Sequence, residues 1–249
     1  MLTAIRDIGR WLRSTKSIEE LETLIQAPFK NTDKKEERLV LFIKINIDEA
    51  KYEGVVREEY DSTKIQRYLY RRGSSNGPNI TPAAQITDVE NKTFPKKITD
   101  WFKKYRDLDD TGIVARIGDV LLNNQNKIIE DIKNALRDNN KKVKVLLTIK
   151  VVKHNQEHYL GDLEIFRTLL TRIVNAQVGK GSATHICSIC GEKKQVSGDP
   201  QIFKFYTIDK PGFIAGGFNK ADAWKNFPLC YECKLDIEEG RRYVEQNLQ

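Results

Sequence analysis

The chain has 249 residues, of which 39% are hydrophobic, and it carries a formal net charge of +7. Such a length suits one or two domains that bury a core without disulfides. No run approaches the ~18 consecutive apolar residues of a membrane-spanning helix, and the first ten residues lack the apolar run of a secretory signal. We therefore expect a cytoplasmic protein with no membrane partner. The basic surplus favours polyanionic partners, although a lysine-rich solvated surface explains it equally well.

Helices and then strands are predicted in the first third of the chain. Apolar spacing predicts a helix over residues 2–12, and Ser17 is a candidate N-cap for a second helix that ends before Pro28. Two β-branched runs, 39–47 and 51–60, are expected to pair as a hairpin. The pattern is then helical from 61 to 70.

The remainder of the chain alternates between helical patterns and one further strand. Residues 71–79 contain glycine, serine and proline and exclude a regular element. Helices are predicted over 96–105, 112–139 and 162–178, with a strong strand over 142–153. Few strands among many helices indicate the α+β class. We expect an irregular mixed domain with a small antiparallel sheet over residues 1–180, and a four-cysteine subdomain with a C-terminal helix over residues 181–249.

The four cysteines form two Cys-x-x-Cys pairs, Cys187 with Cys190 and Cys230 with Cys233. Thiolates two residues apart fit adjacent corners of a tetrahedron around Zn²⁺, and Gly191 permits the tight turn of such a knuckle. Four thiolates leave no open position, so the predicted zinc is structural. The order, with the second pair opening a helix, predicts a treble-clef or ribbon-like zinc knuckle. An empty site and a redox pair are the alternatives, and His185 is a competing ligand.

An enzymatic function has little support in the sequence. Asp107, Asp109 and Asp110 form an acidic cluster that could hold Mg²⁺ for phosphoryl transfer. A solvated loop between two helices is the simpler interpretation of the same residues. The sequence contains no nucleotide-binding P-loop, no dinucleotide fingerprint, no metalloprotease motif and no nucleophile elbow. We therefore expect no catalytic residues.

Several stretches together resemble a known family. They are residues 68–79 (YLYRRGSSNGPN) with Thr81-Pro82, residues 187–193 (CSICGEK), residues 216–218 (GGF), residues 227–233 (FPLCYEC) and residues 238–243 (EEGRRY). These resemble the N-terminal region of the large subunit of type I-B CRISPR Cascade surveillance complexes. The resemblance runs from the first helix to the end of the chain. Because family members are considerably longer, we expect this chain to be an N-terminal fragment.

The resemblance implies a non-catalytic, nucleic-acid-binding subunit. In such complexes the guide RNA reads the target by base pairing, while protein reads a short adjacent motif and the backbone. The implied role is recognition of the protospacer-adjacent motif in double-stranded target DNA and contact with the 5′ end of the guide RNA. Other Cascade subunits and a recruited nuclease-helicase are the implied partners. A zinc-stabilised RNA- or DNA-binding module of another ribonucleoprotein is the alternative, and a metal-dependent nuclease is a third.

The candidate nucleic-acid contacts lie in two segments. In the loop 71–79, Arg71 and Arg72 offer forked donors, and Ser74, Ser75 and Asn76 offer short polar groups for base edges or phosphate. Around the predicted strand, the candidates are lysines: Lys141, Lys142, Lys144, Lys150 and Lys153. The simpler interpretation is that Arg72 pairs with a carboxylate such as Asp61 and that the lysines form the solvated face of a strand.

Overall fold

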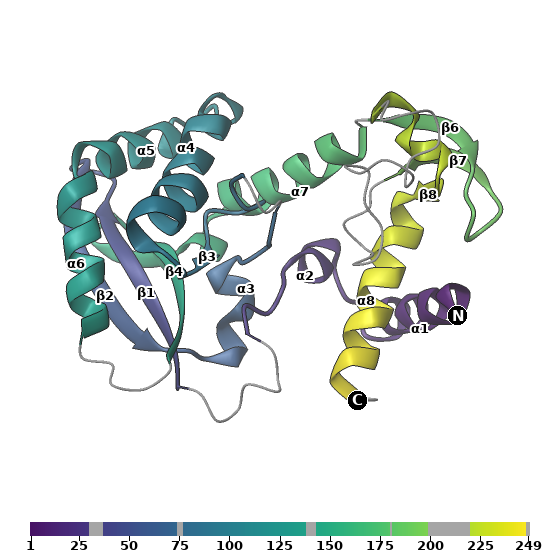
Figure 1. Cartoon of the computed structure of the whole chain (residues 1–249), viewed down its shortest axis with the longest axis horizontal. Coiled ribbons are helices and arrows are strands. Elements are labelled where there is room, and N and C mark those ends of the chain that lie inside the picture. Colours follow the sequence, from purple (N-terminus) through teal and green to yellow (C-terminus); the bar gives the residue numbers. More distant parts are fainter. Residues whose placement is uncertain (30–36, 74–76, 138–142, 180, 199–219, 248–249) are drawn as a thin grey trace. The chain divides into compact units, whose positions relative to one another are not determined.

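The computed structural model describes residues 1–29, 37–73, 77–137, 143–179, 181–198 and 220–247 (Figure 1). They fold into two compact units. We call Ile25–Leu170 the sheet unit, and Met1–Leu24 together with Thr171–Gln249 the cysteine unit. The expected boundary at residue 180 differs from this division, because the N-terminal helices group with the cysteines. The mixture of helices and small sheets predicted from the sequence is confirmed.

The sheet unit is built on a mixed sheet. Its strand order is β2 (Lys51–Glu59), β1 (Glu37–Asn46), β4 (Val143–Lys153), β3 (Ala84–Gln85), and β5 (Gln156–Tyr159) also pairs with β4. The predicted hairpin of β1 and β2 is confirmed, and the turn between them is set by the side chain of Asn46, which accepts from the N–H groups of Asp48 and Glu49. The sheet is not wholly antiparallel as expected, because β1 and β4 pair in parallel.

Both faces of the two central strands are covered. In β1 and β4 every residue from Leu41 to Ile43 and from Val145 to Val152 is buried, which explains their nearly continuous apolar sequence. One face packs on a largely aromatic cluster, whose buried members are Phe29, Val40, Phe42, Tyr68, Tyr70, Ala83, Leu146 and Tyr159. On the other side, α6 (Gln125–Arg137) lies beside β2 (Figure 1).

The helices of the sheet unit differ from their predicted bounds. A short 3₁₀ turn and α3 (Ile65–Tyr68) replace the helix over 61–70. An 11-residue π-helix, Val89–Thr99, precedes α4 (Asp100–Tyr105) and contains Pro95, which lacks an N–H for an α-helical bond. The predicted helix 112–139 is two helices, α5 (Ile113–Asn123) and α6 (Gln125–Arg137). They separate at Asn124, whose amide donates to the carbonyl oxygen of Val120.

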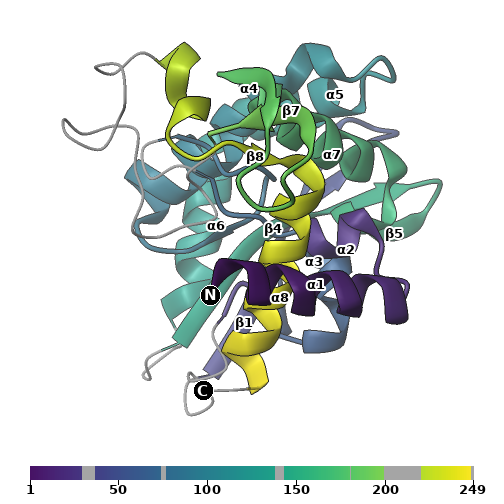
Figure 2. The same ribbon diagram turned by 90° about the vertical axis from the view of Figure 1, so that its right-hand side faces the viewer.

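The cysteine unit consists of helices and a three-stranded antiparallel sheet. Its helices are α1 (Leu2–Thr15), α2 (Glu20–Leu24), α8 (Tyr231–Asn247) and the end of α7 (Glu164–Gly179). The sheet order is β6 (Ser182–Ile186), β7 (Lys193–Ser197), β8 (Leu229–Cys230). Ser17 does not cap α2, because that helix begins three residues later and Ser17 itself adopts a positive φ of 50°. Figure 2 shows α1 crossing α8.

Among the helices of the described residues, none combines the length and the apolar character needed to cross a membrane.

Candidate metal centre and nucleic-acid loop

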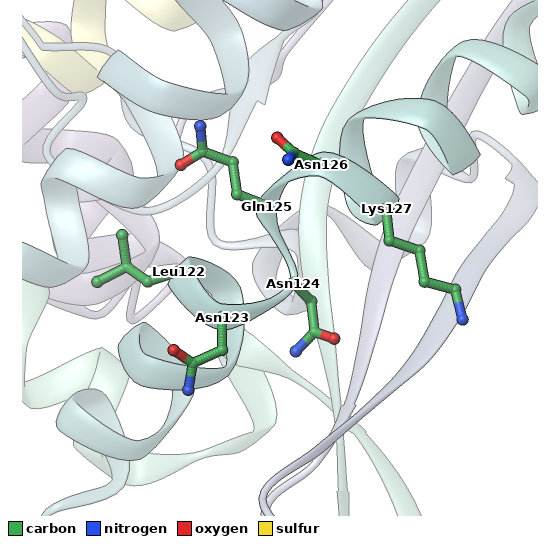
Figure 3. A pocket seen from close by; sticks show the side chains of 6 residues that line it. All are labelled: Leu122, Asn123, Asn124, Gln125, Asn126 and Lys127. Carbon is green, nitrogen blue, oxygen red and sulfur yellow. The ribbon is translucent and has the colours of Figure 1, made fainter.

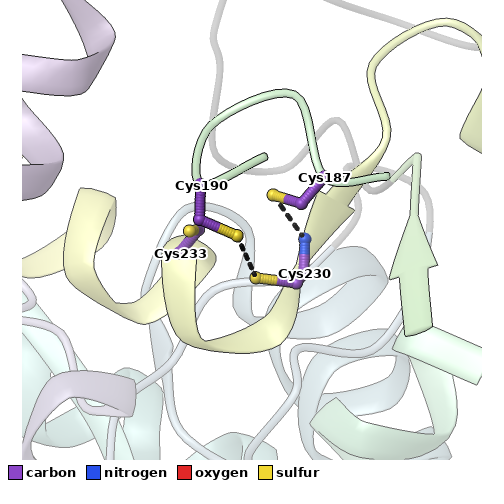
Figure 4. A group of neighbouring side chains, drawn as sticks. All are labelled: Cys187, Cys190, Cys230 and Cys233. Atoms are coloured by element: carbon purple, nitrogen blue, oxygen red, sulfur yellow. Dashed lines mark hydrogen bonds between the residues drawn. The ribbon is translucent and has the colours of Figure 1, made fainter. Parts of the chain in front are cut away.

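The four cysteines converge on one point of the cysteine unit (Figure 4). Cys187 and Cys190 lie on the connection between β6 and β7, where Gly191 adopts a φ of +75°. Cys230 ends β8, and Cys233 lies in the first turn of α8. The first pair therefore belongs to a hairpin turn and the second opens a helix, which is the order expected from the sequence.

The spacing of the sulfur atoms fits a tetrahedral metal ion. All four Sγ atoms lie within 4.8 Å of one another, and Cys190 Sγ is 3.9 Å from Cys230 Sγ. Zn–S bonds of ~2.3 Å at tetrahedral angles place neighbouring sulfurs ~3.8 Å apart. The four cysteines form no disulfide. Three of them are buried and Cys190 is half-buried, so the donor set suits a closed structural zinc site.

Backbone N–H groups surround the first sulfur. Cys187 Sγ accepts from the N–H groups of Ile189 and Cys230, at 3.5 and 3.4 Å. Burial opposes ionisation of the Cys187 thiol, but the backbone N–H groups of Cys190, Cys230 and Ile189 outweigh it and lower its pKa to about 7. Burial raises the pKa of Cys230 to about 11. The backbone donors therefore favour the metal-binding thiolate form of Cys187, and a bound cation would offset the burial that disfavours the thiolate of Cys230.

Histidine is not part of this centre. His185 is exposed, and its ring lies against that of Trp224 at a tilt of 43°, with the ring centroids 5.0 Å apart. The competing-ligand interpretation of His185 is therefore wrong. Within the described residues, the four cysteines are the one group of three or more metal-binding side chains found close together.

Within the acidic cluster, Asp109 accepts hydrogen bonds from backbone N–H groups. Asp109 is buried, and one carboxylate oxygen accepts from the N–H and the hydroxyl of Thr111. The other oxygen accepts from the N–H of Val114, in the first turn of α5. Both oxygens are therefore engaged at a helix start. The cluster lies between α4 and α5, as the simpler interpretation expects, but Asp109 is buried and not solvated.

The loop 71–79 leaves its two arginines in different environments. Arg71 is 2% exposed, so its guanidinium is removed from solvent, whereas Arg72 is exposed. Asp61 is not the partner of Arg72, since it accepts from Thr63 and pairs with Lys64. The predicted contacts Ser74, Ser75 and Asn76 lie outside the described residues.

The two limbs of this loop, residues 71–73 and 77–79, are joined to each other by hydrogen bonds. The side chain of Asn79 accepts from the N–H of Gly73 and donates to the carbonyl oxygen of Ala83, at 3.2 and 2.7 Å. A Cβ on Gly73 would lie 2.6 Å from the carbonyl oxygen of Pro78, so only glycine allows this approach. The hydroxyl of Thr81 accepts from the N–H of Arg71.

Neighbouring elements hold the loop in place. Lys97 of the π-helix donates to the carbonyl oxygen of Gly77 at 2.5 Å, and Trp101 Nε1 donates to that of Ile80 at 2.8 Å. Burial lowers the pKa of Lys97, and the charge of Arg72 lowers it further. Arg72 and Lys97 are thus two cations at one loop. The sequence pattern does not point to Lys97. Its hydrogen bond to the loop forms only because the π-helix packs against residues 77–80.

The candidate lysines of the strand are not equivalent. Lys141 and Lys142 lie outside the described residues, and Lys144 and Lys153 are half-buried on β4. Lys150 is 5% exposed and pairs with Glu58 and Glu157. The expectation that Lys150 contacts DNA is therefore wrong, because its ammonium group is enclosed by carboxylates.

A shallow hollow lies at the corner between α5 and α6. It is lined by Leu122, Asn123, Asn124, Gln125, Asn126 and Lys127 (Figure 3). Its lining is mostly exposed amide groups of one continuous segment. No cluster of ionisable or nucleophilic side chains faces it.

Comparison with known proteins gives two matches to family models. Residues 1–172 match the N-terminal domain of CRISPR-associated protein TM1802, and residues 184–249 match the central domain of the same protein. A search of the curated proteins finds no match, and neither does a search of the solved structures. The matched residues extend over both units described above, and the second match contains all four cysteines. The chain therefore belongs to the family of CRISPR-associated protein TM1802.

Proposed function

We propose that this protein is a non-catalytic large-subunit component of a CRISPR RNA-guided antiviral surveillance complex of type I-B. In this role it recognises the protospacer-adjacent motif of double-stranded target DNA and contacts the 5′ end of the guide RNA. Other Cascade subunits and a recruited nuclease-helicase are its proposed partners. Membership of a CRISPR-associated family supports the setting, and the sequence resemblance supports the specific role.

One observation supports the motif-reading role: hydrogen bonds hold the two limbs of the loop 71–79 in place. A protein that distinguishes base pairs must hold its donors and acceptors in a fixed position. Here Asn79 ties the two limbs of the loop together, and Lys97 and Trp101 tie the loop to neighbouring helices. Tyr68 and Tyr70, just before the loop, are buried in the aromatic cluster. The described residues on either side of 74–76 are therefore held rigidly.

The chemistry of the loop suits a nucleic-acid groove. Arg72 is exposed, and its backbone N–H donates to the side chain of Gln26 at 3.1 Å, which fixes the start of its side chain. A guanidinium in that position offers a forked pair of donors to a phosphate or to the edge of guanine. Asn76 is the proposed partner of base edges. Arg71 supports the loop from within, since it is buried.

The metal has a structural part in this proposal. Zinc at Cys187, Cys190, Cys230 and Cys233 would hold the hairpin turn of β6 and β7 to the start of α8, and would contribute folding free energy to the cysteine unit. No step of target recognition is assigned to the metal. The proposed nucleic-acid contacts belong to the sheet unit.

The test uses the assembled surveillance complex with Arg72→Ala or Asn76→Ala. Binding is measured to duplex targets that carry the correct adjacent motif or a scrambled one. We expect each substitution to reduce the preference for the correct motif about tenfold or more, since a good bidentate contact contributes ~1–3 kcal/mol of discrimination. Arg106→Ala is the matched control, because Arg106 is an exposed arginine that pairs with Asp119.

Two results would contradict the proposal. If both variants keep the wild-type preference while the fold is unchanged, the loop does not read the motif. If they weaken binding to all targets equally, the loop is a phosphate clamp and the motif is read elsewhere. Loss of guide RNA from the Arg72→Ala complex would instead assign the loop to the 5′ end of the guide.

A further inference from the structure

Helix α8 connects the candidate metal centre with the N-terminal segment of the chain. Cys230 precedes the helix directly, and Cys233 lies in its first turn. Asp236 and Gly240 follow about one and two turns later on the same helix. Both of these residues contact α1, so one helix carries two thiolates at its start and the docking site for α1 in its middle.

The backbones of α1 and α8 meet at two glycines. A Cβ on Gly9 would lie 1.7 Å from the carbonyl oxygen of Asp236, and a Cβ on Gly240 would lie 1.9 Å from the carbonyl oxygen of Ile5. Figure 2 shows the two helices crossing. Contact this close leaves neither helix room to rotate or slide. Docking of α1 therefore requires that α8 keeps both its position and its helical form.

A buried charge fixes the same crossing. The side chain of Asp236 is 5% exposed and accepts from Arg10 Nε at 3.1 Å and from Arg13 Nη1 at 2.7 Å, both on α1. A buried carboxylate is costly without such donors. Because Asp236 is only three residues beyond Cys233, fraying of the first turns of α8 would separate it from both arginines.

The short helix α2 also depends on α8. The hydroxyl of Tyr231 donates to the carboxylate of Glu20. Arg242 donates to the carbonyl oxygens of Glu22 and Thr23, at 3.2 and 2.7 Å. Carbonyl groups at the end of a helix have no partner within it, so Arg242 supplies one. Tyr231 stands between the two ligands Cys230 and Cys233 in the chain, which brings this contact to the edge of the metal centre.

We propose that the four-cysteine centre controls the docking of the N-terminal segment Met1–Leu24. With a metal ion bound, the start of α8 is fixed and α1 and α2 pack on it. Without the ion, the metal–sulfur bonds that would tie the β6–β7 turn to the start of α8 are missing, so the start of α8 loosens and the segment is released. The sheet unit keeps its fold. This inference rests on the metal centre and is independent of the nucleic-acid role.

Hydrogen exchange of the 249-residue chain tests the proposal directly. Backbone amide exchange is measured by mass spectrometry with zinc bound and after removal of zinc by a chelator. We expect exchange in α1 and in the first half of α8 to rise about tenfold or more, because local opening then needs less free energy. Exchange in β4, the central strand of the sheet unit, should not change. Cys230→Ser should reproduce the pattern of the metal-free chain.

Two outcomes of that experiment would overturn the proposal. Protection of α1 that persists in the metal-free chain would show that docking is independent of the centre. An equal rise of exchange in β4 would show that metal loss unfolds the whole chain instead of releasing one segment.

Reciprocity gives a second test, since coupling between two equilibria acts in both directions. Arg10→Gln removes one donor to Asp236 without placing a side chain between the helices. We expect its affinity for zinc, measured by competition with a chelator, to be several-fold lower than that of the wild type. Arg106→Gln is the matched control, because it breaks an arginine–aspartate pair of the sheet unit, Arg106 with Asp119, and should retain zinc as the wild type does. Equal zinc retention by both variants would contradict the coupling.

Discussion

Lys150 is a cation held inside the sheet unit by aromatic rings and carboxylates. Its ammonium nitrogen lies 4.7 Å from the ring centroid of Phe42 and 4.9 Å from that of Tyr159. It pairs with Glu58, which also accepts from the hydroxyl of Tyr159, and with Glu157. Ring faces attract a cation, and the two carboxylates neutralise it. The network therefore joins β2, β4 and β5.

Replacing Lys150 by methionine should destabilise the sheet unit. The substitution keeps most of the buried volume but leaves Glu58 and Glu157 without their shared cation. We expect the free energy of unfolding to fall by ~2 kcal/mol, less than for a fully buried pair because both carboxylates are partly exposed. Urea unfolding measures the change. Lys153→Met, three residues further along β4, is the control and should have little effect. Equal loss in both variants would refute a specific role for Lys150.

The same network makes stability depend on acid pH. Burial opposes ionisation of Glu58, but hydrogen bonds from Lys150 and Tyr159 outweigh it and hold its pKa below the ordinary value of 4.5. Burial likewise opposes ionisation of Asp162, and the bond from Arg67 lowers its pKa. Because folding lowers both values, their stabilising contribution is complete above about pH 4.5 and is lost as the pH falls through the folded-state pKa values.

We therefore expect the free energy of unfolding to decrease as the pH is lowered below about 4.5. The variant Glu58→Gln should show a flatter dependence in that range, since it cannot take up the proton. Urea midpoints between about pH 3 and pH 7 provide the measurement. A Glu58→Gln profile that parallels the wild type would show that this carboxylate does not contribute.

At the level of single residues, the sequence was informative where chemistry restricts both residue type and spacing. Four cysteines in two Cys-x-x-Cys pairs have few uses, and the structure brings all four together. The expectation that Lys150 contacts DNA is wrong for a physical reason. An alternating strand places polar residues in solvent when one face is buried, but β4 is buried on both faces, so its lysine needed partners from elsewhere in the fold.

Among the elements, local connections were predictable and distant ones were not. The hairpin of β1 and β2 follows from a short turn, whereas the parallel pairing of β1 with β4 joins segments about a hundred residues apart, with helices between them. The sequence does not predict the break between α5 and α6, because the apolar pattern continues across Asn124. Neither glycine nor proline marks the position. The sequence does not predict the π-helix, because a proline such as Pro95 normally marks a helix start or end.

Asp109 provides a prediction about an element, the start of α5. Its two carboxylate oxygens accept from Thr111 and Val114, so Asp109→Ala should lower the free energy of unfolding by ~1–2 kcal/mol, the usual cost of losing a helix cap. Thermal unfolding measures the loss, and the exposed Asp110 provides the control variant Asp110→Ala. If Mg²⁺-dependent DNA cleavage is observed and disappears in Asp109→Ala, the non-catalytic role proposed above is wrong.

On the scale of the whole molecule, the first helices and the last helix belong to one unit. The amphipathic pattern of α1 predicted that one face is buried but could not name the partner. That partner is α8, more than two hundred residues later, and the two glycines that meet there look unremarkable in the sequence. The expected division at residue 180 therefore places the N-terminal helices with the sheet, whereas they pack within the cysteine unit.

The net charge of +7 leads to the last prediction, which concerns binding of duplex DNA without regard to sequence. We expect the isolated chain to bind duplex DNA weakly, with affinity that falls steeply between about 50 and about 200 mM salt, because each phosphate contact releases counterions. Fluorescence anisotropy over a salt series measures the slope of log affinity against log salt concentration.

Arg72→Gln and Lys144→Gln should each reduce this slope by about one if these residues touch phosphates. Lys103→Gln is the control, since Lys103 is an exposed lysine near Asp100. Equal effects of all three would indicate attraction by the overall charge alone, and binding that ignores ionic strength would exclude a phosphate-contacting surface.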